Sequence, residues 1–124
     1  MKKYPLYLVF LLAACSKNND HPKDTAVPFI ILASPTANEV FNAGATVSVN
    51  GTITDNTRIS EVHVHVYNNT TGALLMDIHR NPSDANYVLN ESFTAQTGIQ
   101  YKIQVIAKDN SANESLVTVY ISTN

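Results

Sequence analysis

The chain alternates short apolar runs with polar turn clusters from residue 28 to its end. The runs are rich in Val, Ile, Thr, Tyr and Phe, and clusters of Gly, Pro, Asn and Asp separate them. No segment shows the 3.6-residue periodicity of an amphipathic helix, so the pattern predicts an all-β fold. We expect seven strands, at residues 29–34, 45–54, 59–67, 73–80, 87–95, 100–108 and 115–123.

Strict alternation in two of these runs predicts which side chains are buried. Val62, Val64 and Val66 alternate with polar residues, and Tyr101, Ile103, Val105 and Ala107 do the same. One face of each strand is therefore expected in a core. Seven short strands with frequent turn signals predict an immunoglobulin or fibronectin type III β-sandwich over residues 28–124.

Asn50-Gly51 is compatible with a tight hairpin turn, but such a turn would leave very short strands on either side. We therefore expect Gly51 to lie inside one strand.

The N-terminus has the pattern of a lipoprotein signal. Lys2 and Lys3 precede the apolar run 6–12, and two alanines then lead to Cys15, which is the one cysteine of the chain. The run is shorter than the roughly 20 residues of a membrane span. We expect residues 1–14 to be removed as a signal peptide and Cys15 to be lipidated, with membrane attachment through its acyl chains. The polar residues 15–27 are expected to form a tether.

Charge and motif content exclude several function classes. The formal net charge is −2 and no basic cluster is present, so nucleic acid is not expected as a partner. A lipidated lone cysteine leaves no disulfide. The chain has no G-x-S-x-G motif, and its carboxylates are scattered one per loop or strand. We therefore expect a protein that is not an enzyme and that needs no cofactor.

Histidines occur at alternate positions in one predicted hairpin. Pairing Val62 with Ile78 and Val64 with Met76 would bury the apolar partners. The opposite face would then place His63 against Asp77, Glu61 against His79 and His65 against Leu75.

This face supports more than one interpretation. Imidazole and carboxylate suit Zn²⁺ or Cu²⁺, so a metal site at His63, His65, Asp77 and His79 is one hypothesis. A binding surface formed by Glu61, His63, His65 and Tyr67 is another. Histidine–carboxylate pairs on a solvated sheet, or a response to pH, would also account for the pattern.

A second cluster of oxygen ligands is expected where three loops meet at one end of the sandwich. Such ligands suit Ca²⁺, although the same residue types also make tight turns. The calcium hypothesis involves Asp55, Asn56, Asp84, Asp109, Asn110 and Asn113.

Three segments resemble bacterial immunoglobulin-like modules: residues 49–56, residues 59–64, and residues 98–113 with the patterns G-x-x-Y and A-x-D-x-x-x-N. The resemblance implies that the hydroxyl of Tyr101 bonds back to the preceding corner and that a turn follows the strand. It implies no activity.

With its signal and tether, the whole chain resembles small surface lipoproteins of Bacteroidetes that carry one such domain. Ser16 after Cys15 then implies the outer membrane. Asp24-Thr25-Ala26 is similar to an O-glycosylation pattern of those bacteria, at Thr25, although a chance tripeptide explains it more simply, because polar linkers are rich in these residue types.

Three functions remain open from the sequence. The first is a lipid-anchored binding or adhesion module for a glycan or protein. The second is an envelope protein that binds metal on its histidine face. The third is an accessory subunit that adds an edge strand to a larger surface complex.

Overall fold

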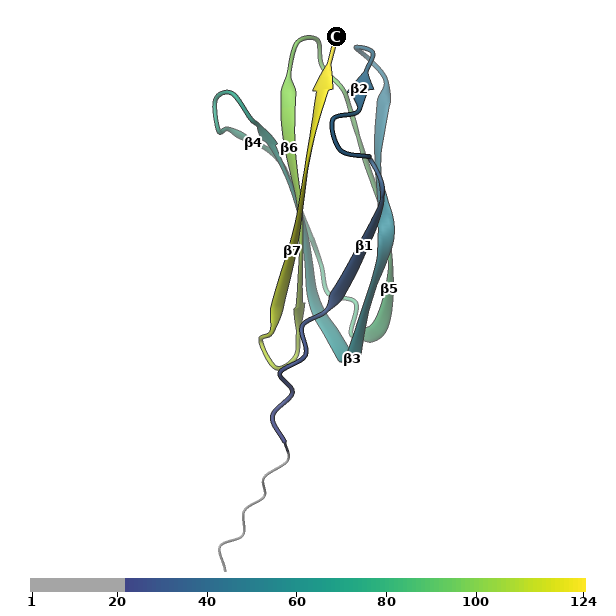
Figure 1. The fold of residues 1–124 in the computed structure, drawn as a ribbon, viewed down its shortest axis with the longest axis vertical. Coiled ribbons are helices and arrows are strands. Elements are labelled where there is room, and N and C mark those ends of the chain that lie inside the picture. The colour runs from purple at the N-terminus through teal and green to yellow at the C-terminus, as the bar shows by residue number, and fades with distance from the viewer. Residues whose placement is uncertain (1–21) are drawn as a thin grey trace, which may run out of the picture.

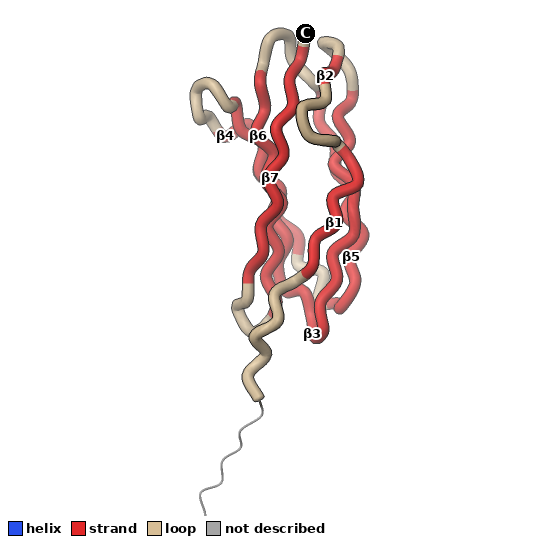
Figure 2. The backbone as a smooth tube through the Cα atoms, viewed as in Figure 1, coloured by secondary structure: helices blue, strands red, loops and turns tan. Residues whose placement is uncertain are grey.

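The computed structural model describes residues 22–124. These residues form seven strands and no helix, which confirms the predicted all-β fold (Figures 1 and 2). None of the described segments is a helix long and apolar enough to cross a membrane. The strands are β1 (Phe29–Ser34), β2 (Val40–Phe41), β3 (Thr46–Asn68), β4 (Leu74–Arg80), β5 (Asp84–Thr94), β6 (Gln100–Asp109) and β7 (Glu114–Thr123).

Strand β3 takes part in both layers of the sandwich (Figure 1). Its first half pairs with β1 and β5, and its second half pairs with β4 and β6. Strand β7 extends the second layer beside β6, and the short β2 pairs with β7 in parallel. The separate strands predicted at residues 45–54 and 59–67 are thus one continuous strand.

The sequence pattern predicted neither the continuity of β3 nor the short strand β2, and each has a local cause. The register of β3 against β5 shifts between Thr54 and Ile59, so the strand bends from one layer to the other without ending. The carboxylate of Asp55 accepts hydrogen bonds from the N–H groups of Thr57 and Arg58 inside this bend. Strand β2 has only two residues, which is too short for any periodicity to reveal it.

The predicted register of the histidine hairpin is wrong by two residues. Val64 pairs with Ile78 rather than with Met76, and His63 and His65 therefore face His79 and Asp77. The predicted pairs His63–Asp77, Glu61–His79 and His65–Leu75 do not form. A slip of two keeps every side chain on its expected face, because side chains alternate with a period of two.

The slip of two residues is accounted for by two local features of the hairpin, its longer turn and a β-bulge. The side-chain oxygen of Asn68 accepts hydrogen bonds from the N–H groups of Thr70 and Thr71. Gly72 has a positive φ of 77°, which closes the turn. The register then shifts by one more residue between Val66 and Tyr67, as in a β-bulge.

The core lies between the two layers and confirms the predicted alternation. Both layers contribute fully buried aliphatic side chains, and the inward residues of β6 are buried along the whole strand. The core comprises Val47, Val49, Ile53, Ile59, Val62, Val64, Val66, Leu89, Ala95, Tyr101, Ile103, Val105, Ala107, Val119 and Ile121.

Gly51 lies inside β3, as predicted, and its position has a steric cause. A Cβ atom at this residue would lie 2.1 Å from the backbone oxygen of Ile31 on β1. Only glycine allows β1 to pair this closely with β3.

The expected bond of Tyr101 is also present. The N–H of Gln96 donates to the Tyr101 hydroxyl over 2.9 Å, and Gly98 in the intervening corner has a φ of 74°. This bond fixes the corner that leads into β6.

The sandwich has two distinct ends (Figure 1). Residues 22–28, which we call the N-terminal segment, approach one end, where β3 bends and the β6–β7 loop lies. The other end carries β2, the β3–β4 loop and the C-terminus. Strand β6 runs between these ends, from Gln100 to Asp109, a length of roughly 30 Å at about 3.3 Å per residue.

Candidate functional site

The outward side chains of β3 and β4 form a histidine face, which we define as Glu61, His63, His65, Asp77 and His79. Alternation on β3 places Glu61, His63 and His65 on one side, and the register brings Asp77 and His79 beside them. The side chains of His63 and His65 are 23% and 21% exposed, so the sheet holds both rings partly in place. The four residues of the metal hypothesis therefore share one face.

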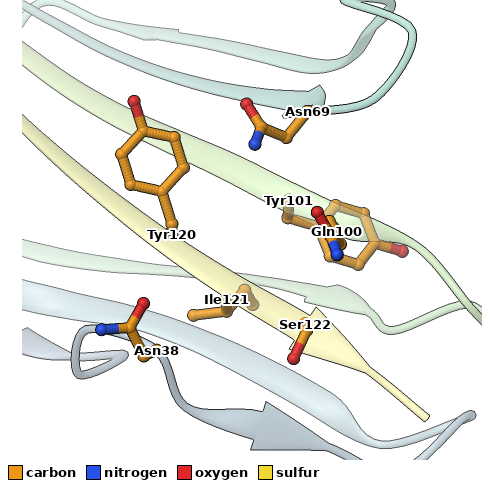
Figure 3. A pocket seen from close by; sticks show the side chains of 7 residues that line it. All are labelled: Asn38, Asn69, Gln100, Tyr101, Tyr120, Ile121 and Ser122. Carbon is orange, nitrogen blue, oxygen red and sulfur yellow. The ribbon is translucent and has the colours of Figure 1, made fainter.

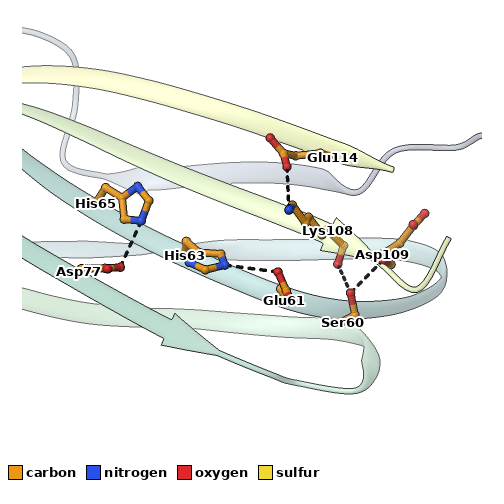
Figure 4. A network of polar contacts seen from close by, with 8 residues as sticks. All are labelled: Ser60, Glu61, His63, His65, Asp77, Lys108, Asp109 and Glu114. Carbon is orange, nitrogen blue, oxygen red and sulfur yellow. Dashed lines mark hydrogen bonds and ion pairs between the residues drawn. The ribbon is translucent and has the colours of Figure 1, made fainter. Parts of the chain in front are cut away.

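Short polar contacts connect this face (Figure 4). Nε2 of His65 lies 3.1 Å from Oδ1 of Asp77, and Nε2 of His63 lies 3.4 Å from Oε2 of Glu61. The His63 ring stacks on His79 with centroids 4.2 Å apart and an interplanar angle of 20°. It meets the His65 ring edge-on, with centroids 5.6 Å apart and an angle of 61°.

The same sheet surface continues over Tyr67 toward β6 and β7. Tyr67 lies opposite Lys102, which in turn lies opposite Tyr120. The Lys102 ammonium lies 4.8 Å from the centroid of the Tyr67 ring, and Tyr120 is 47% exposed. The predicted binding residue Tyr67 therefore connects the histidine face to Lys102 and, across β6, to Tyr120.

A cleft of about 230 Å³ includes Tyr120 and lies where β6 begins and β7 ends. Figure 3 shows the side chains that line it. The sequence gives no sign of this cleft, because its residues come from four separate segments and belong to no motif. We call it the distal cleft. It is lined by Asn38, Asn69, Gln100, Tyr101, Tyr120, Ile121 and Ser122.

Backbone hydrogen bonds fix the walls of the distal cleft. The N–H of Asn38 donates to the carbonyl of Tyr120 over 2.8 Å, and the N–H of Asn69 donates to the carbonyl of Gln100 over 2.7 Å. Within residues 22–124, the side-chain amides of Asn38, Asn69 and Gln100 and the hydroxyl of Tyr120 make no hydrogen bonds to other residues. The cleft thus offers solvent-exposed polar side chains on a fixed backbone to a ligand.

The opposite end of the sandwich gathers three carboxylates, Asp24 before β1, Asp55 in the bend of β3 and Asp109 at the end of β6, whose ligand atoms lie within 4.8 Å of one another. We call them the acidic cluster. Asp24 belongs to the segment predicted as a tether, whose polar composition gave no sign that it contacts the domain. Its backbone oxygen accepts a hydrogen bond from the Asn113 side chain, and the Asn56 side chain donates to its carboxylate.

Most of the polar groups in these loops bond to one another. Asp109 is 2% exposed, and its carboxylate accepts hydrogen bonds from the N–H groups of Ser111 and Asn113 and from the side chain of Asn113. Thr57 donates to the side-chain oxygen of Asn110. The hydrogen bond from Asn56, followed by that from the Ala26 N–H, lowers the pKa of Asp24 below its ordinary value of 3.8.

Asp84 is not one of the three carboxylates of the acidic cluster. It begins β5 in register with Ile59, beyond the bend of β3, and its carboxylate accepts a bond from the N–H of Asn86 instead. The other residues of the calcium hypothesis lie in the bend of β3, at the end of β6 and in the turn between β6 and β7, and calcium binding itself remains a prediction.

The predicted signal peptide and Cys15 lie outside the described residues. Thr25, the residue of the glycosylation pattern, is exposed.

The sequence and fold place the chain in one family. Residues 28–105 match the bacterial Ig domain family, and the chain belongs to it. No curated protein matches the sequence.

Solved structures show the same fold at low sequence identity. The fibronectin(III)-like modules of Clostridium thermocellum CbhA are 22% identical, with a TM-score of 0.54 over 79% of this chain and 47% of that chain. This chain therefore spans about half of that protein's length. A superoxide reductase (neelaredoxin) from Ignicoccus hospitalis is 11% identical, with a TM-score of 0.50 over 80% of this chain and 81% of that one.

The CARDB domain of a Pyrococcus furiosus protein, solved in complex with di-metal ions, is 15% identical to this chain. Its TM-score is 0.50 over 78% of this chain and 90% of that one. These likenesses confirm the immunoglobulin-like sandwich.

Proposed function

We propose that the protein is a lipid-anchored, non-enzymatic binding module of the bacterial envelope that binds a neutral glycan in the distal cleft. Membership of the bacterial Ig domain family supports a surface-associated module of binding or adhesion type. The observation that carries the proposal is the lining of the cleft, where three side-chain amides and a half-exposed tyrosine have no partners within the described chain.

The chemistry of this lining favours a sugar. Each carboxamide offers donors and an acceptor, which matches the hydroxyl groups of a sugar ring. Tyr120 presents an aromatic surface against which the apolar side of such a ring packs. None of the lining residues carries a charge, so the cleft suits a neutral ligand. Its volume is below the roughly 300–1,000 Å³ of sites for drug-sized ligands, so we expect it to hold a single ring of a longer glycan.

The position of the cleft supports a surface role. Asp24 bonds to Asn56 and Asn113 at one end of the sandwich, whereas the cleft is lined by residues at the opposite end, where β6 begins and β7 ends. Figure 1 shows these two ends of β6 and β7. With Cys15 lipidated, this arrangement directs the cleft away from the membrane to which the protein is attached. The outer membrane, implied by Ser16, is the location that we propose.

Glycan-array screening of the purified protein, followed by calorimetry with the selected neutral oligosaccharide, tests the proposal. We expect Asn69→Ala and Gln100→Ala each to weaken binding by about tenfold or more, because each removes a hydrogen-bonding group worth about 1.5 kcal/mol. Asn90→Ala is the matched control, since Asn90 is an exposed amide on β5 in the other layer.

Equal binding by all three variants would overturn the assignment of the cleft. Absence of binding to any glycan, together with capture of a protein partner, would replace the glycan with a protein ligand. Mass spectrometry of the membrane-extracted protein tests the anchor separately, with loss of acylation expected for Cys15→Ala.

A further inference from the structure

The histidine face lies apart from the distal cleft, on a different stretch of the same sheet, and the glycan proposal does not use it. It brings three imidazoles and two carboxylates into contact on a half-exposed surface. The face contains two groups of three residues, and within each group the ligand atoms lie within 4.8 Å of one another. One group is Glu61, His63 and His79, and the other is His63, His65 and Asp77. His63 belongs to both groups, so the orientation of its ring relative to His79 and to His65 decides which group can bind an ion.

Stacking disfavours joint coordination by His63 and His79. An imidazole nitrogen directs its lone pair in the plane of its ring, and these two planes are inclined by only 20° with centroids 4.2 Å apart. Lone pairs in nearly parallel, stacked planes do not converge on one ion. The rings of His63 and His65 are not stacked: they meet edge-on at 61° with centroids 5.6 Å apart, and their ligand atoms lie within 4.8 Å of each other and of Asp77.

The contacts around His63 and His65 suit a metal site of this kind. Nε2 of His65 already lies 3.1 Å from Oδ1 of Asp77, close to the roughly 3.3 Å that separates neighbouring ligands in a tetrahedral zinc site with bonds of about 2.0–2.1 Å. Glu61 lies against Nε2 of His63, and the Tyr67 hydroxyl lies 3.4 Å from Nδ1 of His65. Such partners on the second ring nitrogen orient a ligating histidine and fix its tautomer.

We infer that His63, His65 and Asp77 bind a divalent first-row transition metal ion, Zn²⁺ or Cu²⁺. Two imidazoles and one carboxylate supply three ligands, and water completes the tetrahedron. Glu61 and Tyr67 orient the two histidines, and His79 holds the His63 ring by stacking on it. Neither thiolate nor a dense oxygen shell is present on this face, so the ligands favour these ions over Ca²⁺ or Mg²⁺.

Calorimetry with ZnCl₂ and separately with CuCl₂ on the protein purified without a histidine tag tests the inference. A His21→Ala background removes the one histidine outside the described residues. We expect a single ion per chain and a loss of affinity of at least a hundredfold for His65→Ala and for Asp77→Asn. His79→Ala and Glu61→Gln are expected to lose only about tenfold, the range seen for residues that orient ligands.

Two controls keep this test interpretable. Asp24→Asn removes a carboxylate from the acidic cluster and is expected to leave zinc binding unchanged. Thermal unfolding without metal is expected to be the same for all variants, which separates lost coordination from lost folding. Electron paramagnetic resonance of the Cu²⁺ complex is expected to show two coordinated imidazole nitrogens.

Binding that survives His65→Ala but is abolished by His79→Ala would overturn the assignment of ligands. Absence of Zn²⁺ and Cu²⁺ binding at micromolar concentrations would overturn the site altogether. Neither result bears on glycan binding, because the distal cleft contains none of these residues.

Discussion

The two ends of the sandwich differ in how their polar side chains are used. At the end that the N-terminal segment approaches, Asp109 accepts three hydrogen bonds, and Asp24 joins the loops through Asn56 and Asn113. At the other end, the side-chain amides of the distal cleft have no such partners in the described chain. The hydrogen bonds of Asp24 and Asp109 stabilise the first end, where Oδ1 of Asp55 alone is buried without a partner among the described residues, whereas the amides at the second end are exposed and available to a ligand.

Asp109→Ala is expected to have the largest effect on stability. The change leaves the partly buried N–H groups of Ser111 and Asn113 without acceptors, at a cost of about 3 kcal/mol in the free energy of unfolding. Denaturant unfolding measures this loss, with Asp84→Ala as a control expected to change stability by less than about 0.5 kcal/mol. Equal effects of the two substitutions would remove the structural role that we assign to these loops.

Tyr120→Ala is expected to show the reverse behaviour at the distal cleft. Tyr120 is half-exposed and its side chain has no bonded partner among the described residues, so stability should change by about 0.5 kcal/mol or less. Glycan affinity should fall by about tenfold, as calorimetry can measure. Leu116→Ala is the matched control, because Leu116 is an exposed apolar residue on the same face of β7. If it weakens binding equally, the ligand lies farther along the sheet.

Tyr101→Phe tests whether a residue of the cleft lining contributes to stability and not to glycan binding. Tyr101 lines the cleft, but its hydroxyl accepts a hydrogen bond from the Gln96 N–H. The lost bond is expected to destabilise the protein by about 1 kcal/mol and to leave glycan affinity nearly unchanged. Tyr120→Phe should not affect stability. Unfolding midpoints of the two variants, measured side by side, make the comparison.

Acidification should release the N-terminal segment before it affects the cleft. The pKa of Asp24 is lowered in the folded protein, so its contribution to stability is complete above about pH 3.8 and is lost as the pH falls through the lower, folded-state pKa. Amide chemical shifts of Ala26 and Asn56 measured through this titration report the release. Asp24→Asn should abolish the pH dependence, and persistence of the transition in this variant would assign it to another group.

Much of the fold follows from local sequence patterns. Alternating residues such as Val62, Val64 and Val66 indicated the buried face, and the corner around Tyr101 was recognisable from its spacing with Gly98. The strand register in the histidine hairpin could not be recognised in this way, because a bulge and a longer turn shift the register by two residues. Periodicity reports which face a side chain occupies, but it does not report the partner across the strand.

The candidate sites also divide into one that the sequence predicts and two that it does not. The histidine face was predictable because its residues alternate along one strand and its nearest neighbour. Asp24 was missed because it precedes the domain, and the distal cleft because Asn38, Asn69, Gln100 and Tyr120 meet only through the tertiary fold. Sites built from distant segments leave no spacing in the sequence to recognise.

Amide chemical-shift mapping of the purified protein during titration with its neutral glycan tests the central claim most directly. We predict that the largest shifts occur at Asn38, Asn69, Gln100 and Tyr120, with little change in the loops that contain Asp24, Asp55 and Asp109. Shifts concentrated in those loops, with the distal cleft unaffected, would contradict the account.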